Sequence, residues 1–302
     1  MMNLSSTFLE YPPEQQAIRA KCFHPSGSFI EFNKEEVEQS IPARFEKQVA
    51  VYPDRIAVKT RRHSLTYAEL NRAANPVAHA ILAHHAKGEE PVAFLLGHDV
   101  NLISAILGAL KAGKMCVVLD PSLPRARIAY ILEDSQAALL VTDSKHLASA
   151  RELVHDDRRL LNMDQSDAGL AVENPALSLP PDHCNYLCYT SGSTGRPKGV
   201  IQNHRNVLHE AMLYANGLHI SPEDRVALLY SCSASQGMKI LFSALLNGAA
   251  LCLYEVREEG LADLADWLIA EEITIYFSIP IVFRQWSGAL TGEEEFPKLR
   301  LI

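Results

Sequence analysis

The feature that most constrains the fold is a repeated alternation of short, uninterrupted apolar runs with helical patterns. The runs are Val92–Leu96, Met115–Leu119, Ala137–Val141, Val226–Tyr230 and Ala250–Tyr254. The same alternation predicts a further strand over Ile273–Phe277. Apolar residues between the runs recur at helical spacing. Strands that are apolar on both faces and alternate with amphipathic helices are typical of a parallel sheet covered by helices on each side. We therefore expect an α/β fold with two helix-flanked, mostly parallel sheets.

The flanking segments carry weaker signals. Residues 1–35 are polar and include two adjacent prolines, so we expect an irregular leader on the surface. Thr66 followed by Glu69 is a capping box and predicts a helix start. Pro76 lies inside the helical pattern that follows and should kink that helix. Residues 144–183 are polar and end in prolines, which predicts an irregular connector.

Charge and hydropathy exclude several functional classes. The chain of 302 residues has 28 Lys and Arg against 36 Asp and Glu, a net charge of −8. This balance disfavours non-specific binding to nucleic acid or to anionic membranes. The longest apolar stretch, Leu102–Leu110, is too short to span a bilayer. The first residues contain neither a basic nor an apolar signal region, so we expect a cytoplasmic protein without a membrane span.

The six cysteines lie in mostly apolar segments and form no C-x-x-C pair. We interpret them as reduced, buried side chains. Cys184 and Cys188 would share one face of a strand, which allows a zinc site as an alternative. No second pair of ligands lies nearby in the sequence, so a zinc site is disfavoured and no metal bound by protein is predicted.

One segment, YTSGSTGRPKG from Tyr189 to Gly199, combines glycines, hydroxyl side chains and two cations directly after an apolar strand. Glycines let backbone N–H groups converge into an anion-binding nest, and Lys198 adds a point charge suited to phosphate oxygens. The spacing matches neither the Walker pattern nor G-x-G-x-x-G. Composition alone therefore leaves two interpretations open, a phosphate-binding loop and a flexible surface loop.

The same segment resembles the phosphate-loop signature of the adenylate-forming (AMP-binding) superfamily, which includes acyl-CoA synthetases and nonribosomal peptide synthetase adenylation domains. Two further segments resemble core motifs of the adenylation domains, in the right order. These are Leu65–Leu70 (LTYAEL) and Leu110–Gly113 with Leu119–Pro121. The resemblance runs from about residue 40 to the end. It implies a leader over residues 1–35 and the large AMP-binding domain over 36–302.

The resemblance implies a two-step reaction. A carboxylate attacks the α-phosphorus of ATP, bound with Mg²⁺, and gives an acyl-adenylate and pyrophosphate. The thiol of coenzyme A or of a carrier-protein phosphopantetheine then takes the acyl group, so a carrier-protein domain or downstream modules are implied partners. The residues implied to hold the phosphates are Thr190, Ser191, Gly192, Ser193, Thr194, Gly195 and Lys198. Arg196 is interpreted as a solvated cation.

The resemblance also locates an acid-binding pocket at the fourth core motif. Ser235 stands where amino-acid-activating members have an Asp that pairs with the substrate ammonium. A serine cannot neutralise a buried ammonium, so a fatty, hydroxy, keto or aryl acid is favoured over an α-amino acid. Gln236, Lys239 and Ser278 fall at positions that resemble pocket-lining sites. Lys239 has an alternative interpretation as a solvent-facing helix cation.

The sequence holds no match to the family's fifth motif, N-x-Y-G-P-T-E, and Leu299–Ile302 resembles the opening of a strand. We therefore expect the N-terminal fragment of an adenylate-forming ligase, with weak or no activity alone and no certain catalytic residue. His204, in an H-R-N stretch after the loop, is interpreted as a structural helix-start residue. Two alternatives remain: a degenerate module that binds nucleotide or protein without turnover, and a chain completed by a partner polypeptide.

Overall fold

The computed structural model describes residues 12–26, 29–84, 88–154, 158–165, 171–190 and 196–302, and the structural statements below concern these residues. The α-helices are α1 (Pro13–Lys21), α2 (Ile41–Val51), α3 (Tyr67–His84), α4 (Val100–Lys111), α5 (Arg125–Asp134), α6 (Leu147–Leu153), α7 (His204–Leu218), α8 (Ser235–Leu245), α9 (Val256–Glu259), α10 (Leu264–Ala270) and α11 (Pro280–Ala289). The 3-10 helices are η1 (Lys34–Val37) and η2 (Met163–Gln165). The strands are β1 (Ile56–Lys59), β2 (Ser64–Thr66), β3 (Pro91–Leu95), β4 (Met115–Leu119), β5 (Leu139–Thr142), β6 (Arg159–Asn162), β7 (Cys184–Thr190), β8 (Lys198–Asn203), β9 (Arg225–Leu228) and β10 (Ala250–Leu253).

The strands form two mostly parallel sheets, as the sequence predicts. The larger sheet has six strands in the order β6-β5-β3-β4-β7-β8, and the smaller has four in the order β2-β1-β10-β9. In each sheet one edge strand is antiparallel to its neighbour: β8 to β7, and β2 to β1. The other pairs are parallel, so their carboxyl ends lie along one edge of each sheet.

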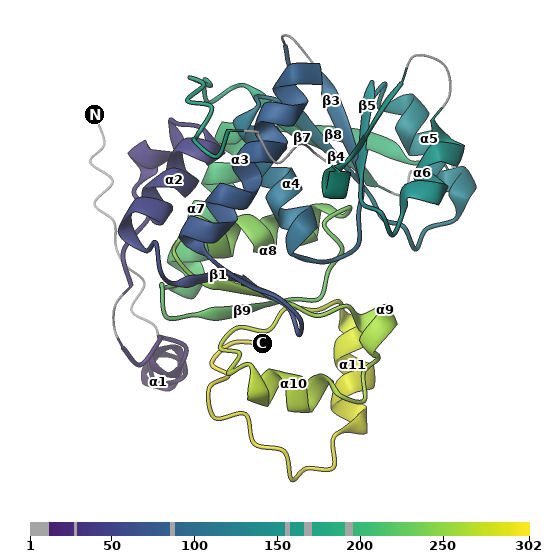
Figure 1. Ribbon diagram of the computed structural model, residues 1–302. Helices are drawn as coiled ribbons and strands as arrows, with labels where there is room; N and C mark the ends of the chain where they lie inside the picture. Colours follow the sequence, from purple (N-terminus) through teal and green to yellow (C-terminus); the bar gives the residue numbers. More distant parts are fainter. Residues whose placement is uncertain (1–11, 27–28, 85–87, 155–157, 166–170, 191–195) are drawn as a thin grey trace.

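Helices and sheets alternate in layers. Helices α2, α3, α4, α7 and α8 share one large core with the inner faces of both sheets. Helices α5 and α6 cover the outer face of the six-stranded sheet, and α10 and α11 cover that of the four-stranded sheet (Figure 1). Along β3, Val92 and Phe94 face the large core, whereas Ala93 and Leu95 face α5 and α6. Burial on both faces explains why the strands form continuous apolar runs in the sequence.

The predicted capping box is present at the start of α3. The Thr66 N–H donates to Glu69 Oε2 at 2.8 Å, and the Glu69 N–H donates to Thr66 Oγ1 at 3.2 Å. The next residue, Tyr67, is fully buried and its hydroxyl donates to the Ala249 carbonyl at 2.9 Å. This bond ties α3 to the start of β10. Pro76 lies within α3, which is assigned as one helix from Tyr67 to His84.

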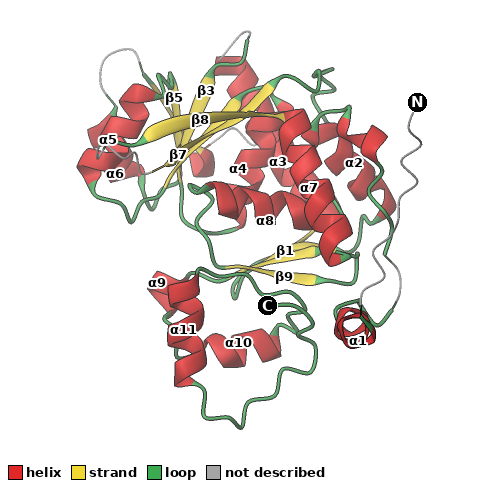
Figure 2. Ribbon diagram, turned by 180° about the vertical axis from the view of Figure 1, so that it is seen from behind, coloured by secondary structure: helices red, strands yellow, loops and turns green. Residues whose placement is uncertain are grey.

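The structure differs from the sequence predictions at five places. Helix α1 lies in the leader that the sequence predicts to be irregular, and it stands on the surface beside the main body (Figure 2). Helix α6 and strand β6 lie within the segment predicted as an irregular connector. Leu153 and Asn162 are buried there, although the polar composition of the segment does not indicate buried residues. Strand β8 and helix α11 were not predicted. Residues 273–277, predicted as a strand, form only isolated bridges, in which Ile275 pairs with Val226 and Leu301.

None of the described helices combines the length and apolar character needed to cross a bilayer.

Candidate functional site

The residues implied in binding follow the carboxyl ends of parallel strands. Thr190 is the last residue of β7, and Ser235 lies shortly after the end of β9. The two sheets approach each other along these edges, where His98, which follows β3, donates from Nε2 to the Leu228 carbonyl of β9 at 3.2 Å. In open α/β sheets the carboxyl edge is where ligands bind, since loops there can vary without disturbing the core.

The two ends of the glycine-rich segment lie side by side. Thr190 of β7 pairs with Lys198 of β8 in the antiparallel register, and both are exposed. Helix α5 holds the segment from outside. Its Tyr130 hydroxyl donates to the Pro197 carbonyl at 3.2 Å, and its Asp134 accepts from the Tyr189 hydroxyl at 2.8 Å. Both flanks of the segment are therefore fixed to one helix.

The remaining residues implied to bind phosphate, Ser191, Gly192, Ser193, Thr194 and Gly195, lie outside the described residues. Arg196 is exposed, as its interpretation as a solvated cation expects. Gly199 packs tightly, because a Cβ added there would lie 2.8 Å from Leu187 Cδ1. A side chain at this position would therefore require the Leu187 side chain to shift.

Three of the four predicted pocket residues share one helix, and the fourth lies on another segment. Ser235, Gln236 and Lys239 lie on the first turns of α8, and Ser278 lies just before α11. The link between the two groups is Tyr214 of α7. Its hydroxyl accepts a hydrogen bond from Gln236 Nε2 at 3.4 Å, and its ring lies 6.2 Å from that of Phe277, the neighbour of Ser278.

Tyr186 of β7 stands behind Ser235. Burial raises the pKa of Tyr186, the nearby Cys188 and Glu210 act in the same direction, and a hydrogen bond with the Ser235 side chain opposes them. The Tyr186 ring stacks on Phe242 of α8 with a centroid distance of 6.4 Å. Ser235 thus lies near a neutral phenol and carries no formal charge of its own.

A carboxylate that the sequence analysis did not identify lies beside this group. Glu210 of α7 is paired with Lys239 of α8, with 2.5 Å between Oε1 and Nζ. The side chains are 30% and 27% exposed, so the pair is only partly accessible to water. The hydrogen bond that Lys239 donates to Glu210 raises the pKa of Lys239, although burial opposes the shift. Lys239 therefore does not face solvent as a free helix-end cation.

His204 has a structural role. It is 1% exposed, and its Nδ1 accepts from the N–H of Ile41, the first residue of α2, at 3.3 Å. Burial, with a smaller contribution from the stacked His183 ring, lowers its pKa to about 3. The ring is therefore neutral near pH 7 and holds α2 against α7.

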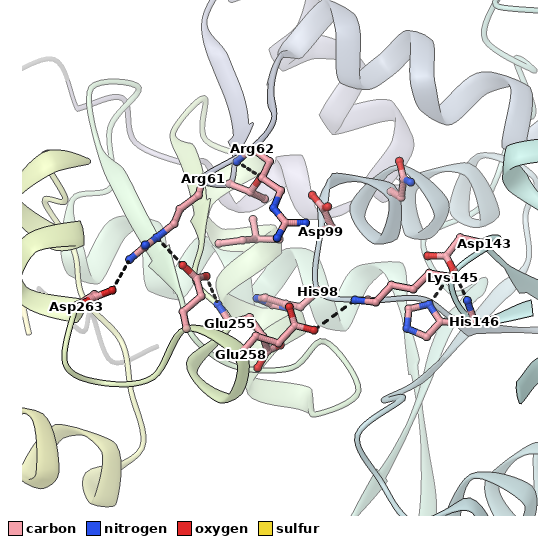
Figure 3. A pocket seen from close by; sticks show the side chains of 15 residues that line it. Arg61, Arg62, His98, Asp99, Asp143, Lys145, His146, Glu255, Glu258 and Asp263 are labelled. Atoms are coloured by element: carbon pink, nitrogen blue, oxygen red, sulfur yellow. Dashed lines mark hydrogen bonds and ion pairs between the residues drawn. The ribbon is translucent and has the colours of Figure 1, made fainter.

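A cavity of about 450 Å³ lies where the carboxyl edges of the two sheets meet (Figure 3). Arg61 follows β1, Lys145 follows β5, and Glu258 and Glu259 belong to α9. One ion pair joins the two sheets across the cavity, with 3.4 Å from Lys145 Nζ to Glu258 Oε1. A second pair, with 2.6 Å from Arg61 Nε to Glu259 Oε2, joins segments that follow β1 and β10 of the four-stranded sheet. The sequence analysis singled out none of these residues, because they are isolated charges in separate loops.

All six cysteines are free thiols, and Cys22 and Cys184 are partly exposed whereas the other four are buried. Within the described ranges no group of three or more His, Cys, Asp or Glu side chains is arranged to hold a metal ion. Cys184 and Cys188 therefore have no partners that would complete a zinc site there.

Comparison with known proteins places these features in a family. The family model described as AMP-binding enzyme matches residues 45–302. The chain is 34% identical over 261 residues to tyrocidine synthase 1 of Brevibacillus parabrevis, which covers 80% of this chain and 23% of that protein. It is 34% identical over 271 residues to gramicidin S synthase 2 of Brevibacillus brevis, covering 87% of this chain and 6% of that protein. The chain thus spans less than a quarter of each of these relatives.

Solved structures confirm the fold. The N-terminal domain of FACL13 from Mycobacterium tuberculosis superposes with a TM-score of 0.78 at 20% identity, covering 86% of this chain and 68% of that one. The Klebsiella oxytoca NpsA N-terminal subdomain in complex with 3-hydroxybenzoyl-AMSN gives a TM-score of 0.76 at 22% identity, covering 86% and 65%. Both matches agree with the predicted large N-terminal domain of the adenylate-forming fold.

Proposed function

Since this chain belongs to the AMP-binding enzyme family, we propose that it takes part in the ATP-dependent activation of a carboxylic acid as an acyl-adenylate, with release of pyrophosphate. The observation that carries the proposal is the placement of the YTSGSTGRPKG segment. It joins β7 to β8 at the carboxyl edge of the six-stranded sheet, and its flanks are fixed by α5. Such a position suits a loop that must hold phosphate groups close to a second substrate.

In this proposal the hydroxyl and backbone N–H groups of the segment, together with Lys198, bind the β- and γ-phosphates of MgATP. The residues are Thr190, Ser191, Gly192, Ser193, Thr194, Gly195 and Lys198. An exposed lysine at the start of β8 can reach a nucleotide without the cost of burying its charge beforehand. The chain's role in such chemistry is to position the reacting groups and stabilise negative charge.

The acid pocket is proposed to lie at the start of α8, lined by Ser235, Gln236, Lys239 and Ser278. Ser235 supplies no counter-charge for an α-ammonium, and its neighbour Tyr186 is a neutral phenol. Leaving an ammonium unpaired there would be costly, so a fatty, hydroxy, keto or aryl acid is favoured over an α-amino acid.

The acceptor of the acyl group is proposed to be a thiol, either coenzyme A or the phosphopantetheine of a carrier protein. Similarity to tyrocidine synthase 1 and gramicidin S synthase 2 supports a carrier-protein domain or downstream modules as partners. The AMP-binding domain is proposed to comprise residues 36–302, preceded by a leader over 1–35. The activity, substrates and partners of the whole protein are likewise proposed, because this chain covers only a small share of the length of those relatives.

The test is ATP–pyrophosphate exchange over a panel of amino, fatty, hydroxy and aryl acids, combined with ATP binding by calorimetry. Lys198→Ala should weaken ATP binding at least about tenfold, the effect of losing one charge-assisted contact. Arg196→Ala is the matched control and should change it little, because Arg196 is exposed and assigned no phosphate. Equal effects of the two substitutions would contradict the role of Lys198. A folded chain that binds neither ATP nor any acyl-adenylate analogue would contradict the proposed function.

A further inference from the structure

Three side chains of α5 and β7 form a hydrogen-bonded group beside the glycine-rich segment. The Tyr189 hydroxyl of β7 donates to Asp134 Oδ2 of α5 at 2.8 Å. The Tyr130 hydroxyl, one turn earlier on α5, lies 3.5 Å from Asp134 Oδ1 and 3.2 Å from the Pro197 carbonyl oxygen, so its single hydrogen can serve either acceptor. We call Tyr130, Asp134 and Tyr189 the α5 clamp.

The α5 clamp contacts the chain next to two residues proposed to bind phosphate. Tyr189 directly precedes Thr190, the last residue of β7. Pro197 directly precedes Lys198, the first residue of β8. Thr190 and Lys198 lie opposite each other in the antiparallel register of the two strands. One helix therefore holds the chain on both sides of this pair, and the placement of α5 determines where the hydroxyl and the ammonium group stand.

Asp134 lies where an acidic residue is unfavourable for the helix itself. It is the last residue of α5, and the last turn of that helix contains no basic residue. A carboxylate there lies at the negative end of the helix dipole. Asp134 is also exposed, so packing in the core does not account for it. Because local rules are most often broken at functional sites, its position indicates a role beyond helix formation.

Helix α5 is a firm support for these contacts. Ile128, Ile131 and Leu132 are buried in the core that α5 shares with the outer face of the six-stranded sheet, and Tyr189 packs against the same core. In the register of β7 and β8, Tyr189 lies opposite Gly199, which has no side chain to hinder the ring from reaching α5. A ligand that binds groups already held in place does not bear the cost of ordering them.

We propose that Tyr130, Asp134 and Tyr189 are positioning residues for the pyrophosphate end of ATP, which they serve by fixing the chain on both sides of the phosphate-binding pair. The inference rests on the proposed function, because it concerns the same phosphate site. The α5 clamp acts through Thr190 and Lys198 and does not itself contact the nucleotide. Its loss should therefore weaken ligands that carry the β- and γ-phosphates and spare AMP, which lacks them.

Charge and positioning predict effects of opposite sign at Asp134. ATP and pyrophosphate are anions, so removal of a neighbouring carboxylate would by charge alone tighten their binding. The α5 clamp predicts that Asp134→Asn weakens both ligands about fivefold, because a neutral acceptor holds the Tyr189 hydroxyl less strongly than a carboxylate does. Tyr189→Phe removes the same hydrogen bond without changing any charge, and it should weaken both ligands to a similar extent.

The two remaining variants test whether the α5 clamp acts as one unit. Asp134→Asn/Tyr189→Phe should bind ATP about as weakly as either single variant, since both substitutions remove one and the same bond. Tyr130→Phe should weaken ATP about twofold, because it removes a hydrogen bond between neutral groups at Pro197.

The experiment measures binding of ATP, inorganic pyrophosphate and AMP to the full chain by calorimetry. Tyr189→Phe and Asp134→Asn should each lower the preference for ATP over AMP about fivefold. Pyrophosphate gives the same comparison without any contact to the nucleoside. Far-UV circular dichroism verifies that each variant is folded. A purely structural role for the α5 clamp would lower the free energy of unfolding without separating the ligands that carry pyrophosphate from AMP.

The matched controls are Glu133→Gln and Tyr254→Phe. Glu133 is the neighbour of Asp134 on α5, is 83% exposed and pairs with Arg158 at 3.5 Å. Its substitution removes a charge from the same helix end without touching the α5 clamp, so binding of pyrophosphate should not weaken. Tyr254→Phe removes a hydroxyl that donates to the Gly260 carbonyl at 2.9 Å, away from β7 and β8, and should leave binding unchanged.

The outcomes separate this inference from the proposed function. Variants Tyr189→Phe and Asp134→Asn that bind pyrophosphate as tightly as Glu133→Gln, or that lose ATP and AMP affinity equally, would overturn the inference while leaving the proposed function intact. If the folded wild-type chain binds neither ATP nor pyrophosphate, the proposed function itself fails, and this inference falls with it.

Discussion

At the scale of single residues, buried polar groups make the most specific predictions. His204 is neutral in the folded chain until the pH falls to about 3, because burial and, to a smaller extent, His183 lower its pKa from 6.5. In the unfolded chain a histidine binds its proton near pH 6.5. Below that pH the unfolded state therefore holds the extra proton, and the free energy of unfolding should fall by roughly 1.4 kcal/mol per pH unit until about pH 3.

The measurement is urea unfolding of the wild type and of His204→Asn between pH 7 and pH 4. Asn places an oxygen near the position of Nδ1, so the hydrogen bond from the Ile41 N–H can persist without a titrating group. The stability difference between variant and wild type should move in favour of the variant as the pH falls. Parallel pH profiles for the two proteins would contradict the assignment of this titration to His204.

Asp224 and Arg300 form a second buried charged group, with exposures of 0% and 5%. Arg300 donates to both carboxylate oxygens, at 2.9 Å from Nε and 2.8 Å from Nη2, and Thr274 donates at 2.6 Å. Burial raises the pKa of Asp224, but the hydrogen bond and charge of Arg300, together with Thr274, outweigh it and hold the pKa below 3.8.

Asp224→Asn should therefore destabilise the chain by about 3–5 kcal/mol at pH 7, since it leaves a buried guanidinium unpaired. The sign of the pH dependence follows from the lowered pKa. The carboxylate stabilises the fold above the unfolded pKa of about 3.9, and that contribution is lost as the pH falls through the lower folded value. Unfolding followed at pH 7 and below pH 4 should show the penalty of the substitution shrinking in acid. A penalty independent of pH would refute this account.

At the scale of elements, the packing of the first turn of α8 against the preceding turn depends on one glycine. A Cβ at Gly237 would lie 2.3 Å from the Ser231 carbonyl oxygen, a backbone atom that cannot move freely. Gly237→Ala should therefore shift the turn before α8 relative to the start of that helix, where Ser235 and Gln236 lie. We expect a destabilisation of about 1–3 kcal/mol, typical of overpacking, together with weaker binding of acyl-adenylate analogues.

The matched control is Gly217→Ala in α7. An added Cβ there meets no atom within 4 Å, and the helical conformation suits alanine. This substitution should stabilise the chain by up to about 1 kcal/mol and leave binding unchanged. Thermal unfolding of the two variants gives the comparison. Equal stability changes would mean that the contact with Ser231 does not constrain α8.

The elements that could be predicted from sequence are those whose burial is continuous. Met115–Leu119 is apolar throughout and forms β4 with the predicted bounds. Strand β8 (Lys198–Asn203) has no such pattern, since Val200 and Ile201 are 43% and 55% exposed. This strand forms through hydrogen bonding with β7 and not through burial of its side chains. Helix α11 buries only Trp286 fully, which gives the sequence little helical periodicity to detect.

At the scale of the whole molecule, the candidate site combines segments that are distant in sequence. The glycine-rich segment could be recognised because its residues are contiguous, and the start of α8 could be located by resemblance. Glu210 could not, because its significance depends on Lys239, 29 residues later, facing it across two antiparallel helices. The cavity between the sheets was not predicted for the same reason, since Lys145 and Glu258 meet only after both sheets have formed.

The last prediction concerns what residues 1–302 can do alone. They hold the glycine-rich segment and the proposed acid pocket but no match to N-x-Y-G-P-T-E, the motif that the family resemblance associates with binding adenosine and magnesium. Losing such preorganised contacts commonly lowers turnover by about a hundredfold or more. We therefore expect the isolated chain to bind ATP and acyl-adenylate analogues weakly and to catalyse little ATP–pyrophosphate exchange.

The comparison is between this chain and the same chain with a second polypeptide that carries the missing motif. Binding without turnover in the first case, and at least about hundredfold faster exchange in the second, would show that the two sheets described here supply the phosphate and acid sites while other residues complete catalysis. Rapid exchange by the isolated chain, abolished by Lys198→Ala, would instead show that these 302 residues are sufficient. The adenosine would then have to be held by groups already present at the carboxyl edges of the sheets.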